Sequence, residues 1–151
     1  MTTVGSLIAG PNSAPSSWKA HEGHPGYRID QLEHLATHSQ YNFTPWLEFK
    51  PDIITMHVGT NDCMQKATAG MAIDRMRSLL NMTVNALPGA KVFVASIIDL
   101  PPQGKDCQQG LNEALPGLLK ELDGAKVYYV PLAEQTIGMC GPNKTYFCEG
   151  K

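Results

Sequence analysis

A turn-rich loop at residues 21–26 holds residue types that can stabilise negative charge at a reaction centre. It reads His-Glu-Gly-His-Pro-Gly and leads directly into a helical pattern. A glycine just before a helix can present its backbone N–H with no side chain in the way, and such a group can stabilise an oxyanion. Gly26 is therefore a candidate oxyanion donor, with His24 in a supporting position.

The same loop has two other interpretations. His21, Glu22 and His24 are all potential metal ligands, but their spacing matches none of the standard zinc signatures. The segment can also be read as a plain glycine turn that carries surface histidines. We therefore predict no metal site in this loop.

A second polar segment, Gly59 to Asp62, comes directly after the nearly continuous apolar run at residues 53–58. An asparagine amide at a strand end can donate to a developing negative charge, and one such donor typically lowers a barrier by about 2.7–4 kcal/mol. Asn61 is thus the second candidate donor. Gly59 opens the turn, and we expect Asp62 to hold it by accepting backbone N–H bonds. The alternative is an ordinary strand-to-helix turn, since all three residue types favour turns.

The elements that must position these segments alternate along the chain. Apolar runs predict strands at residues 2–8, 53–58, 91–98 and 126–132, and helical periodicity predicts helices at 28–39, 67–87 and 111–122. Pro116 predicts a kink or break in the last helix. The alternation is typical of an α/β fold with a parallel sheet, in which loops at the carboxyl ends of the strands build the site.

Three further histidines lie outside the first loop. His57 falls within a predicted buried strand, so we interpret it as a core histidine, with a role as a general base as the alternative. His34 and His38 are four residues apart, which places them on one face of a helix. We expect that face to be solvated.

The whole chain, residues 1–151, has the size and composition of one domain. Hydrophobic residues make up 42% and charged residues 17%, which is enough apolar material for a core. The net charge of −2 is unlike that of a basic nucleic-acid-binding domain. We therefore predict no nucleic-acid partner. We also predict no membrane partner, since no apolar run reaches membrane-spanning length. The sequence does not indicate the oligomeric state.

The four cysteines, at positions 63, 107, 140 and 148, form no Cys-x-x-Cys pair. Three disulfide connectivities are possible. We favour a local bridge between Cys140 and Cys148, which would leave Cys63 with Cys107 to join two loops that each follow a strand. Three Asn-x-Ser/Thr sequons, at positions 42, 81 and 143, favour an exported protein. The alternative is four buried free thiols in a cytosolic protein, and Met1 is not followed by a signal-peptide pattern.

Two blocks of sequence carry a family resemblance. EGHPGYRID at residues 22–30 and KPDIITMHVGTND at residues 50–62 closely resemble the SGNH hydrolases, also called GDSL-like esterases. The branch that looks nearest contains secreted acetyl xylan esterases. By this resemblance, Gly26 matches a backbone oxyanion donor, Asn61 matches a side-chain donor and Gly59 opens the block that carries Asn61. The resemblance spans roughly residues 3–100 and implies a three-layer α/β/α, flavodoxin-like fold with a parallel sheet.

The departures from the family pattern are equally specific. The family's nucleophile is the serine of a GDS motif on the first strand, and its base is the histidine of a late Asp-x-x-His motif. Neither motif occurs in this chain. The segment at residues 3–7 resembles the family's second strand, so we interpret Ser6 as strand structure and assign no nucleophile. We therefore expect an incomplete fold, a fragment of a secreted parent with little or no activity of its own.

The resemblance also implies a substrate class. It points to acetyl or other short acyl esters, on a small molecule or a polysaccharide, hydrolysed without metal or organic cofactor. The alternative is a non-catalytic carbohydrate-binding pseudoenzyme that uses aromatic side chains to stack on sugars. Its candidate stacking residues are Trp18, Tyr27, Tyr41, Phe43 and Trp46.

Overall fold

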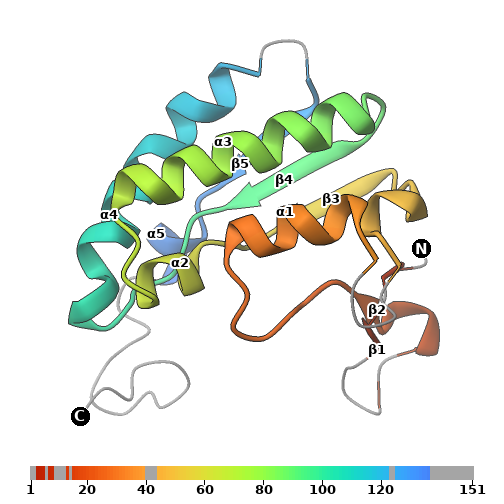
Figure 1. Ribbon diagram of the computed structural model, residues 1–151, viewed down its shortest axis with the longest axis horizontal. Coiled ribbons are helices and arrows are strands. Elements are labelled where there is room, and N and C mark those ends of the chain that lie inside the picture. Colours follow the sequence, from red (N-terminus) through yellow and green to blue (C-terminus); the bar gives the residue numbers. More distant parts are fainter. Residues whose placement is uncertain are drawn as a thin grey trace.

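The computed structural model describes residues 3–5, 7–8, 13, 15–39, 44–122 and 125–136 (Figure 1). Its α-helices are α1 (Ile29–Thr37), α2 (Thr60–Met64), α3 (Ala69–Ala86), α4 (Pro102–Lys120) and α5 (Leu132–Thr136). Its strands are β1 (Leu7–Ile8), β2 (Ala20–His21), β3 (Ile53–Met56), β4 (Lys91–Ala95) and β5 (Val127–Val130), and two 3₁₀ turns are η1 (Ser16–Trp18) and η2 (Trp46–Phe49).

The main sheet is parallel and has the strand order β3-β4-β5. Ile53 lies opposite Lys91 at the start of the β3–β4 pairing, and Val92 lies opposite Val127 at the start of the β4–β5 pairing. Helices α2 and α3 connect β3 to β4, and α4 connects β4 to β5. This strand and helix alternation confirms the predicted α/β fold with a parallel sheet.

Three helices cover one face of the sheet. Helix α3 packs between α1 and α4, and Figure 1 shows α1 and α3 in front of the strands. The core between the helices and the sheet is mainly apolar, with Ile29, Leu80, Val94 and Leu111 all at 0% exposure. Within the described residues, helices α1, α3 and α4 therefore form the layer whose packing positions the site.

The opposite face of the sheet is open to solvent over the described ranges. Ile53 on β3 is 48% exposed and Tyr128 on β5 is 44% exposed, and the ring of Phe93 stacks on that of Tyr128 with centroids 5.0 Å apart. The expectation that residues 53–58 form a buried strand was wrong, because exposed and half-buried positions precede the buried Met56 in β3. The apolar run reflects an edge strand with one buried face.

Two other elements differ from the sequence prediction. Among the described residues of the expected strand at 2–8, Leu7–Ile8 form the strand, which pairs antiparallel with Ala20–His21 in a separate two-stranded sheet. Helix α4 begins at Pro102, well before the predicted start at residue 111, and continues without a break through Pro116. Its first turns are rich in glycine and polar residues, which hid the helical pattern, whereas Pro at the first helical position is favourable.

The disulfide between Cys63 and Cys107 confirms the predicted pairing. It joins two helices, α2 and α4, with Cα atoms 5.2 Å apart, and not the two loops that we expected. Ser6, the Cys140–Cys148 pair and the sequons at positions 42 and 143 lie outside the described residues. The remaining sequon asparagine, Asn81, is exposed on α3.

None of the helices in the described part of the chain combines the length and apolarity that a bilayer crossing requires.

Candidate active site

The second predicted segment is a strand-to-helix turn that requires glycine. Gly59 follows β3 and is the N-cap of α2, with φ at +112°, a left-handed conformation that favours glycine. A Cβ atom at this position would lie 2.8 Å from Leu111 Cδ2 and 2.9 Å from Ile97 Cδ1. The core packs directly against the Gly59 backbone, so both the torsion and the available space select glycine.

Asn61 connects this turn to the first predicted segment. Its side-chain amide Nδ2 donates to the Tyr27 carbonyl oxygen at 2.9 Å, although the two residues are 34 positions apart in the sequence. Asn61 is half-buried in the first turn of α2. The two segments singled out by their chemistry therefore meet in space, with Asn61 next to the residue that follows Gly26.

Gly26 occupies a tight turn. The Tyr27 N–H donates to the His24 carbonyl oxygen at 3.3 Å, which closes a four-residue turn with Pro25 and Gly26 at its centre. The φ of Gly26 is +80°, and a Pro-Gly pair with positive φ at the second position is the pattern of a type II turn. Gly26 is exposed, and a Cβ there would meet nothing within 4 Å, so the torsion alone selects glycine.

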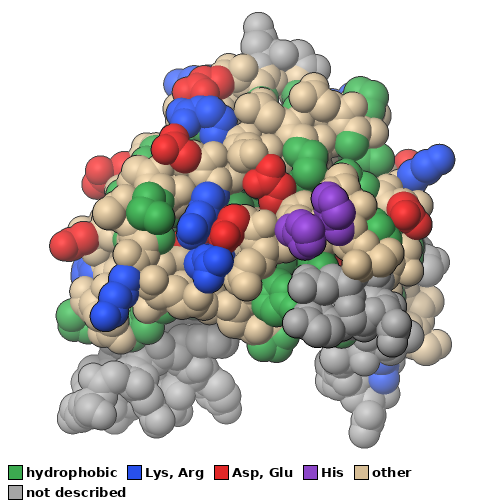
Figure 2. Space-filling model, viewed as in Figure 1, with side chains coloured by type: hydrophobic (Ala, Val, Ile, Leu, Met, Phe, Trp, Pro, Cys, Tyr) green, Lys and Arg blue, Asp and Glu red, His purple; other side chains and the backbone are tan. Residues whose placement is uncertain are grey.

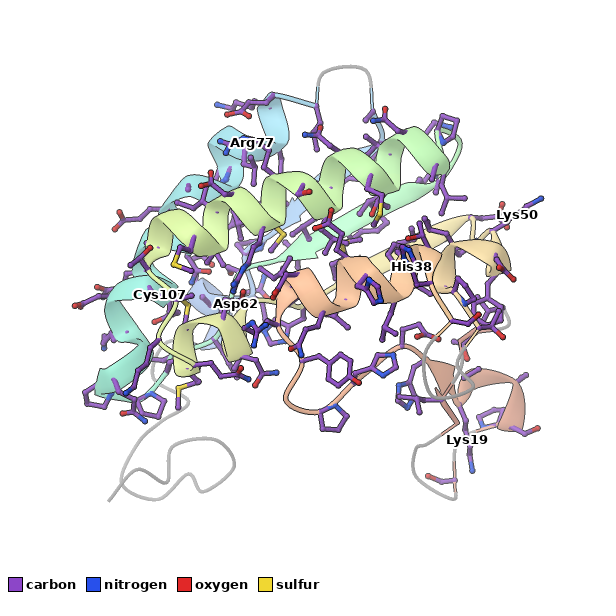
Figure 3. All side chains as sticks on the ribbon, in the orientation of Figure 1. Lys19, His38, Lys50, Asp62, Arg77 and Cys107 are labelled. Atoms are coloured by element: carbon purple, nitrogen blue, oxygen red, sulfur yellow. A yellow bond between two sulfur atoms is a disulfide. The ribbon has the colours of Figure 1, made fainter. Side chains whose placement is uncertain are left out.

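Asp62 performs a different task from the one predicted. It is fully buried, and its Oδ2 accepts the backbone N–H of Ile29 at 2.9 Å, so it holds the start of α1 and not its own loop. Its Oδ1 accepts from Arg75 Nη1 on α3 at 2.7 Å. Figure 3 shows Asp62 where α1, α2 and α3 converge. A buried carboxylate needs such partners, since an unpaired buried charge is costly.

Further acidic and basic side chains lie at the surface above Asp62. Figure 2 shows charges of both signs gathered on this face. Arg28 donates to both carboxylate oxygens of Asp30, at 2.9 and 3.0 Å. Arg75 lies 3.6 Å from the same carboxylate. The hydrogen bond from Arg28 and the positive charge of Arg75 lower the pKa of Asp30, and the hydrogen bond to Asp30 raises the pKa of Arg28.

His24 is buried support for the turn and not a surface histidine. Its side chain is 4% exposed, and its Nε2 lies 2.8 Å from Glu22 Oε2. Its ring also packs against the Tyr27 ring with centroids 5.1 Å apart. His21, the other histidine of this loop, accepts the Gly23 N–H at its Nδ1. Among the residues with described positions, no group of three or more His, Cys, Asp or Glu is arranged to hold a metal ion.

A cavity of about 300 Å³ opens at the meeting point of the two segments. It is lined by Glu22, Gly23, His24, Pro25, Tyr27, Leu32, His57, Val58, Gly59, Thr60 and Asn61. The interpretation of His57 as a core histidine was wrong, because it lies just past the end of β3, exposed and in the cavity wall. Desolvation by the surrounding wall lowers its pKa.

The remaining histidines behave as expected. His34 and His38 are exposed on α1 and its C-cap, and their rings stack with centroids 4.3 Å apart. Neither residue lines the cavity.

Comparison with known proteins decides the family. The sequence profile of the GDSL-like Lipase/Acylhydrolase family matches residues 5–150. The chain belongs to this family. The resemblance to the SGNH hydrolases is therefore confirmed. A comparison with curated proteins finds no match.

Solved structures support the same assignment. A family 3 carbohydrate esterase from Clostridium thermocellum has 29% identity and a TM-score of 0.69, covering 87% of this chain and 59% of that chain. A family 3 carbohydrate esterase from Talaromyces cellulolyticus has 28% identity and a TM-score of 0.64, covering 84% and 60%. A serine-to-alanine variant of an acetyl esterase, crystallised with an acetate ion, has 28% identity and a TM-score of 0.65, covering 83% and 61%. This GDSL-like chain thus spans about three fifths of the length of these structures.

Two residues of this GDSL-like site escaped the sequence prediction. Gln65 Nε2 donates to the Gly26 carbonyl oxygen at 2.7 Å, and its Oε1 accepts from Arg28 Nη1 at 3.1 Å. Arg75 supplies the counter-charge of Asp62. The available signal for Gln65 was its spacing of four residues from Asn61, which puts both amides on one helix face. No local signal marks Arg75.

Proposed function

We propose that Gly26 and Asn61 are the oxyanion-binding half of a carboxylic-ester hydrolase site. The supporting observation is the 2.9 Å hydrogen bond from the Asn61 amide to the Tyr27 carbonyl, beside the Gly26 turn and in the wall of the cavity. Ester hydrolysis develops negative charge on the acyl oxygen, and fixed N–H donors stabilise that charge. Gly59 allows the turn that presents Asn61. Asp62 holds the start of α1, and the buried His24 packs against the Tyr27 ring at the Gly26 turn.

The Asn61 amide has the capacity for this role. An asparagine side chain carries two N–H groups, and Tyr27 engages one of them. No second acceptor for this amide occurs in the described part of the structure, so the other N–H can face a substrate oxygen. The bond to Tyr27 fixes the amide plane, and a preorganised donor costs no reorganisation during the reaction.

The proposed substrates are acetyl or other short acyl esters, carried by a sugar, a polysaccharide or a small alcohol. The support is that the matched structures are named as an acetyl esterase and as carbohydrate esterases. We further propose an extracellular setting for this protein. The Cys63–Cys107 disulfide and the exposed Asn81 sequon favour it, since disulfides persist in oxidising compartments.

Acetate titration of the ¹⁵N-labelled chain tests the oxyanion proposal. We expect saturable NMR shift changes at the Gly26 backbone amide and the Asn61 side-chain amide, because the carboxylate oxygens mimic the negative acyl oxygen. Asn61→Ala should weaken acetate binding, whereas Asn81→Ala, an exposed asparagine on α3, should not. Acetate shifts confined to other residues would overturn the proposal.

Turnover is a separate question from oxyanion binding. The chain contains neither a GDS nor an Asp-x-x-His motif, and a hydroxyl without an adjacent base is a weak nucleophile. We therefore expect no hydrolysis of p-nitrophenyl acetate above the buffer rate. Turnover that Asn61→Ala abolishes would refute this expectation of inactivity and support the esterase site directly.

Carbohydrate binding without turnover is the second proposal, and Tyr27 is the residue that favours it. Tyr27 lines the cavity and its ring is only partly buried. Trp46 is a poor stacking surface, because its Nε1 donates to the Leu32 carbonyl at 3.0 Å and its ring packs against the core. Calorimetric titration with xylo-oligosaccharides tests this proposal, with binding expected in the wild type and lost in Tyr27→Ala. Equal affinity in both proteins would exclude Tyr27 as a platform.

A further inference from the structure

Helix α2 and its C-cap residue Gln65 hold the Gly26 turn and the start of α1 through three side chains. Asn61 donates to the Tyr27 carbonyl at 2.9 Å, Asp62 accepts the Ile29 N–H at 2.9 Å, and Gln65 donates to the Gly26 carbonyl at 2.7 Å. Asn61 lies in α2, and Gln65, four positions on, is the C-cap residue whose backbone N–H donates to the Asn61 carbonyl at 2.9 Å, so the two side chains lie on one face. Two amides from one helix face thus bind two successive carbonyls of the loop.

The Gly26 turn depends on these bonds because packing contributes little to it. Gly26 is exposed, and a side chain built there would meet nothing within 4 Å. Glycine also has the widest choice of backbone torsions. The direction of the Gly26 N–H therefore needs an external constraint, and Gln65 supplies a hydrogen bond to the carbonyl of Gly26 itself.

We propose that Gln65 is a positioning residue that anchors the Gly26 turn on α2, so that the Gly26 N–H keeps a fixed relation to the Asn61 amide. This inference rests on the proposed oxyanion function. The cavity lining includes Pro25 and Tyr27, on either side of Gly26, but neither Gly26 nor Gln65. Gln65 contacts the Gly26 carbonyl, so it acts through the turn and not by contact with an ester.

The Gln65 amide is itself held in one orientation. Arg28 Nη1 donates to Gln65 Oε1 at 3.1 Å, which turns Nε2 toward the Gly26 carbonyl. Arg28 is fixed in turn by its two hydrogen bonds to Asp30. Since a guanidinium only donates and a carbonyl oxygen only accepts, a flipped amide would lose both bonds.

Two substitutions separate these bonds. Gln65→Glu keeps an acceptor for Arg28 but removes the donor to Gly26, and Gln65→Met removes both without adding charge. Gln109→Glu, an exposed glutamine on α4, is the matched control for net charge. The probe is acetate, titrated into the ¹⁵N-labelled 151-residue chain with the Cys63–Cys107 disulfide intact.

We expect both Gln65 variants to bind acetate about five-fold more weakly than the wild type, as loss of one hydrogen bond implies, with the Gly26 amide shifted already in the ligand-free protein. The urea midpoint should change little, since Gln65 is exposed. Gln109→Glu should match the wild type in all three measurements. Wild-type acetate affinity and an unchanged Gly26 shift in both Gln65 variants would overturn the proposal.

The experiment also separates the two proposals. If acetate shifts neither Gly26 nor Asn61 in the wild type, the oxyanion function fails. In that case the NMR shift of the Gly26 amide, compared between the ligand-free wild type and the two Gln65 variants, still tests whether Gln65 anchors the turn. If only Gln65→Glu loses affinity, the cause is the added charge, and the positioning role is rejected.

Discussion

The Asp62 carboxylate and the Arg75 guanidinium form a 2.7 Å ion pair that is buried at one end and open at the other. Asp62 is at 0% side-chain exposure, whereas Arg75 retains 23%. The second oxygen of Asp62 accepts the Ile29 N–H. The Asp62 carboxylate therefore joins the start of α1 to α3 beneath the candidate site. Removal of Asp62 and removal of Arg75 should lower the free energy of unfolding by different amounts.

Replacing Arg75 should destabilise the fold strongly. Arg75→Met leaves Asp62 buried without its counter-charge, and loss of one partner of a buried pair typically costs about 3–5 kcal/mol. Arg77→Met on the same helix is the control, because its ion pairs with Asp74 and Glu121 are exposed and worth about 1 kcal/mol or less. Urea unfolding measures both, and equal midpoints for the two variants would contradict the prediction.

Alanine should have opposite effects at two glycines. At Gly59, with φ at +112° and Leu111 and Ile97 within 3 Å of a built Cβ, Gly59→Ala should destabilise by about 2 kcal/mol or more. At Gly117, inside α4 with nothing within 4 Å, Gly117→Ala should stabilise by about 0.5–1 kcal/mol. Thermal or urea unfolding is the measurement. A tolerated Gly59→Ala would show that this turn relaxes readily.

The disulfide should contribute substantially to stability. It closes a separation of 44 residues, for which the loop-entropy relation gives about 4 kcal/mol. The Cys63→Ala, Cys107→Ala double variant should therefore unfold at a lower urea concentration than the wild type. A Cys140→Ala, Cys148→Ala double variant is the comparison, and the much shorter loop of the predicted local bridge should contribute less. If the urea midpoints of the first variant and the wild type coincide, the bridge adds no stability.

His57 should titrate below the usual histidine range. Desolvation lowers its pKa from the ordinary value of 6.5, so the folded state binds fewer protons than the unfolded state between the two values. The contribution of His57 to stability should be complete above pH 6.5 and decline as the pH falls toward the lowered value. NMR titration of the imidazole resonances measures it, with His57→Gln to assign the signal. A titration midpoint at or above 6.5 would refute the prediction.

The parts of the site that sequence could predict are those with a local cause. The turn at Gly59 follows from its composition and from the apolar run before it. The parallel sheet follows from alternating strand and helix patterns, even though several boundaries moved and α4 begins well before its predicted start. The Cys63–Cys107 pair was predicted as the remainder left by an assumed local bridge between Cys140 and Cys148.

The parts that escaped prediction depend on contacts between distant residues. Asp62 was expected to hold its own turn, but it binds the Ile29 N–H, 33 positions away. Gln65 binds Gly26 across 39 positions, and neither residue has a sequence neighbour that signals the other. His57 was assigned to the core because an apolar run surrounds it, yet it lies beyond the last paired residue of β3. Periodicity reports the average environment of a segment and misses such endpoints.

The short helix α2 makes connections in three directions from neighbouring positions. Asn61 reaches the loop before α1, Asp62 reaches α1 and α3, and Cys63 is covalently linked to α4. A rigid turn with three attachments cannot adjust one of them without disturbing the others. Substitutions in the Cys107 region of α4, far along the chain from the cavity, should therefore be transmitted to Asn61, which lines it. Laboratory evolution of this chain should then recover changes in α4 together with changes in α2, and seldom either alone.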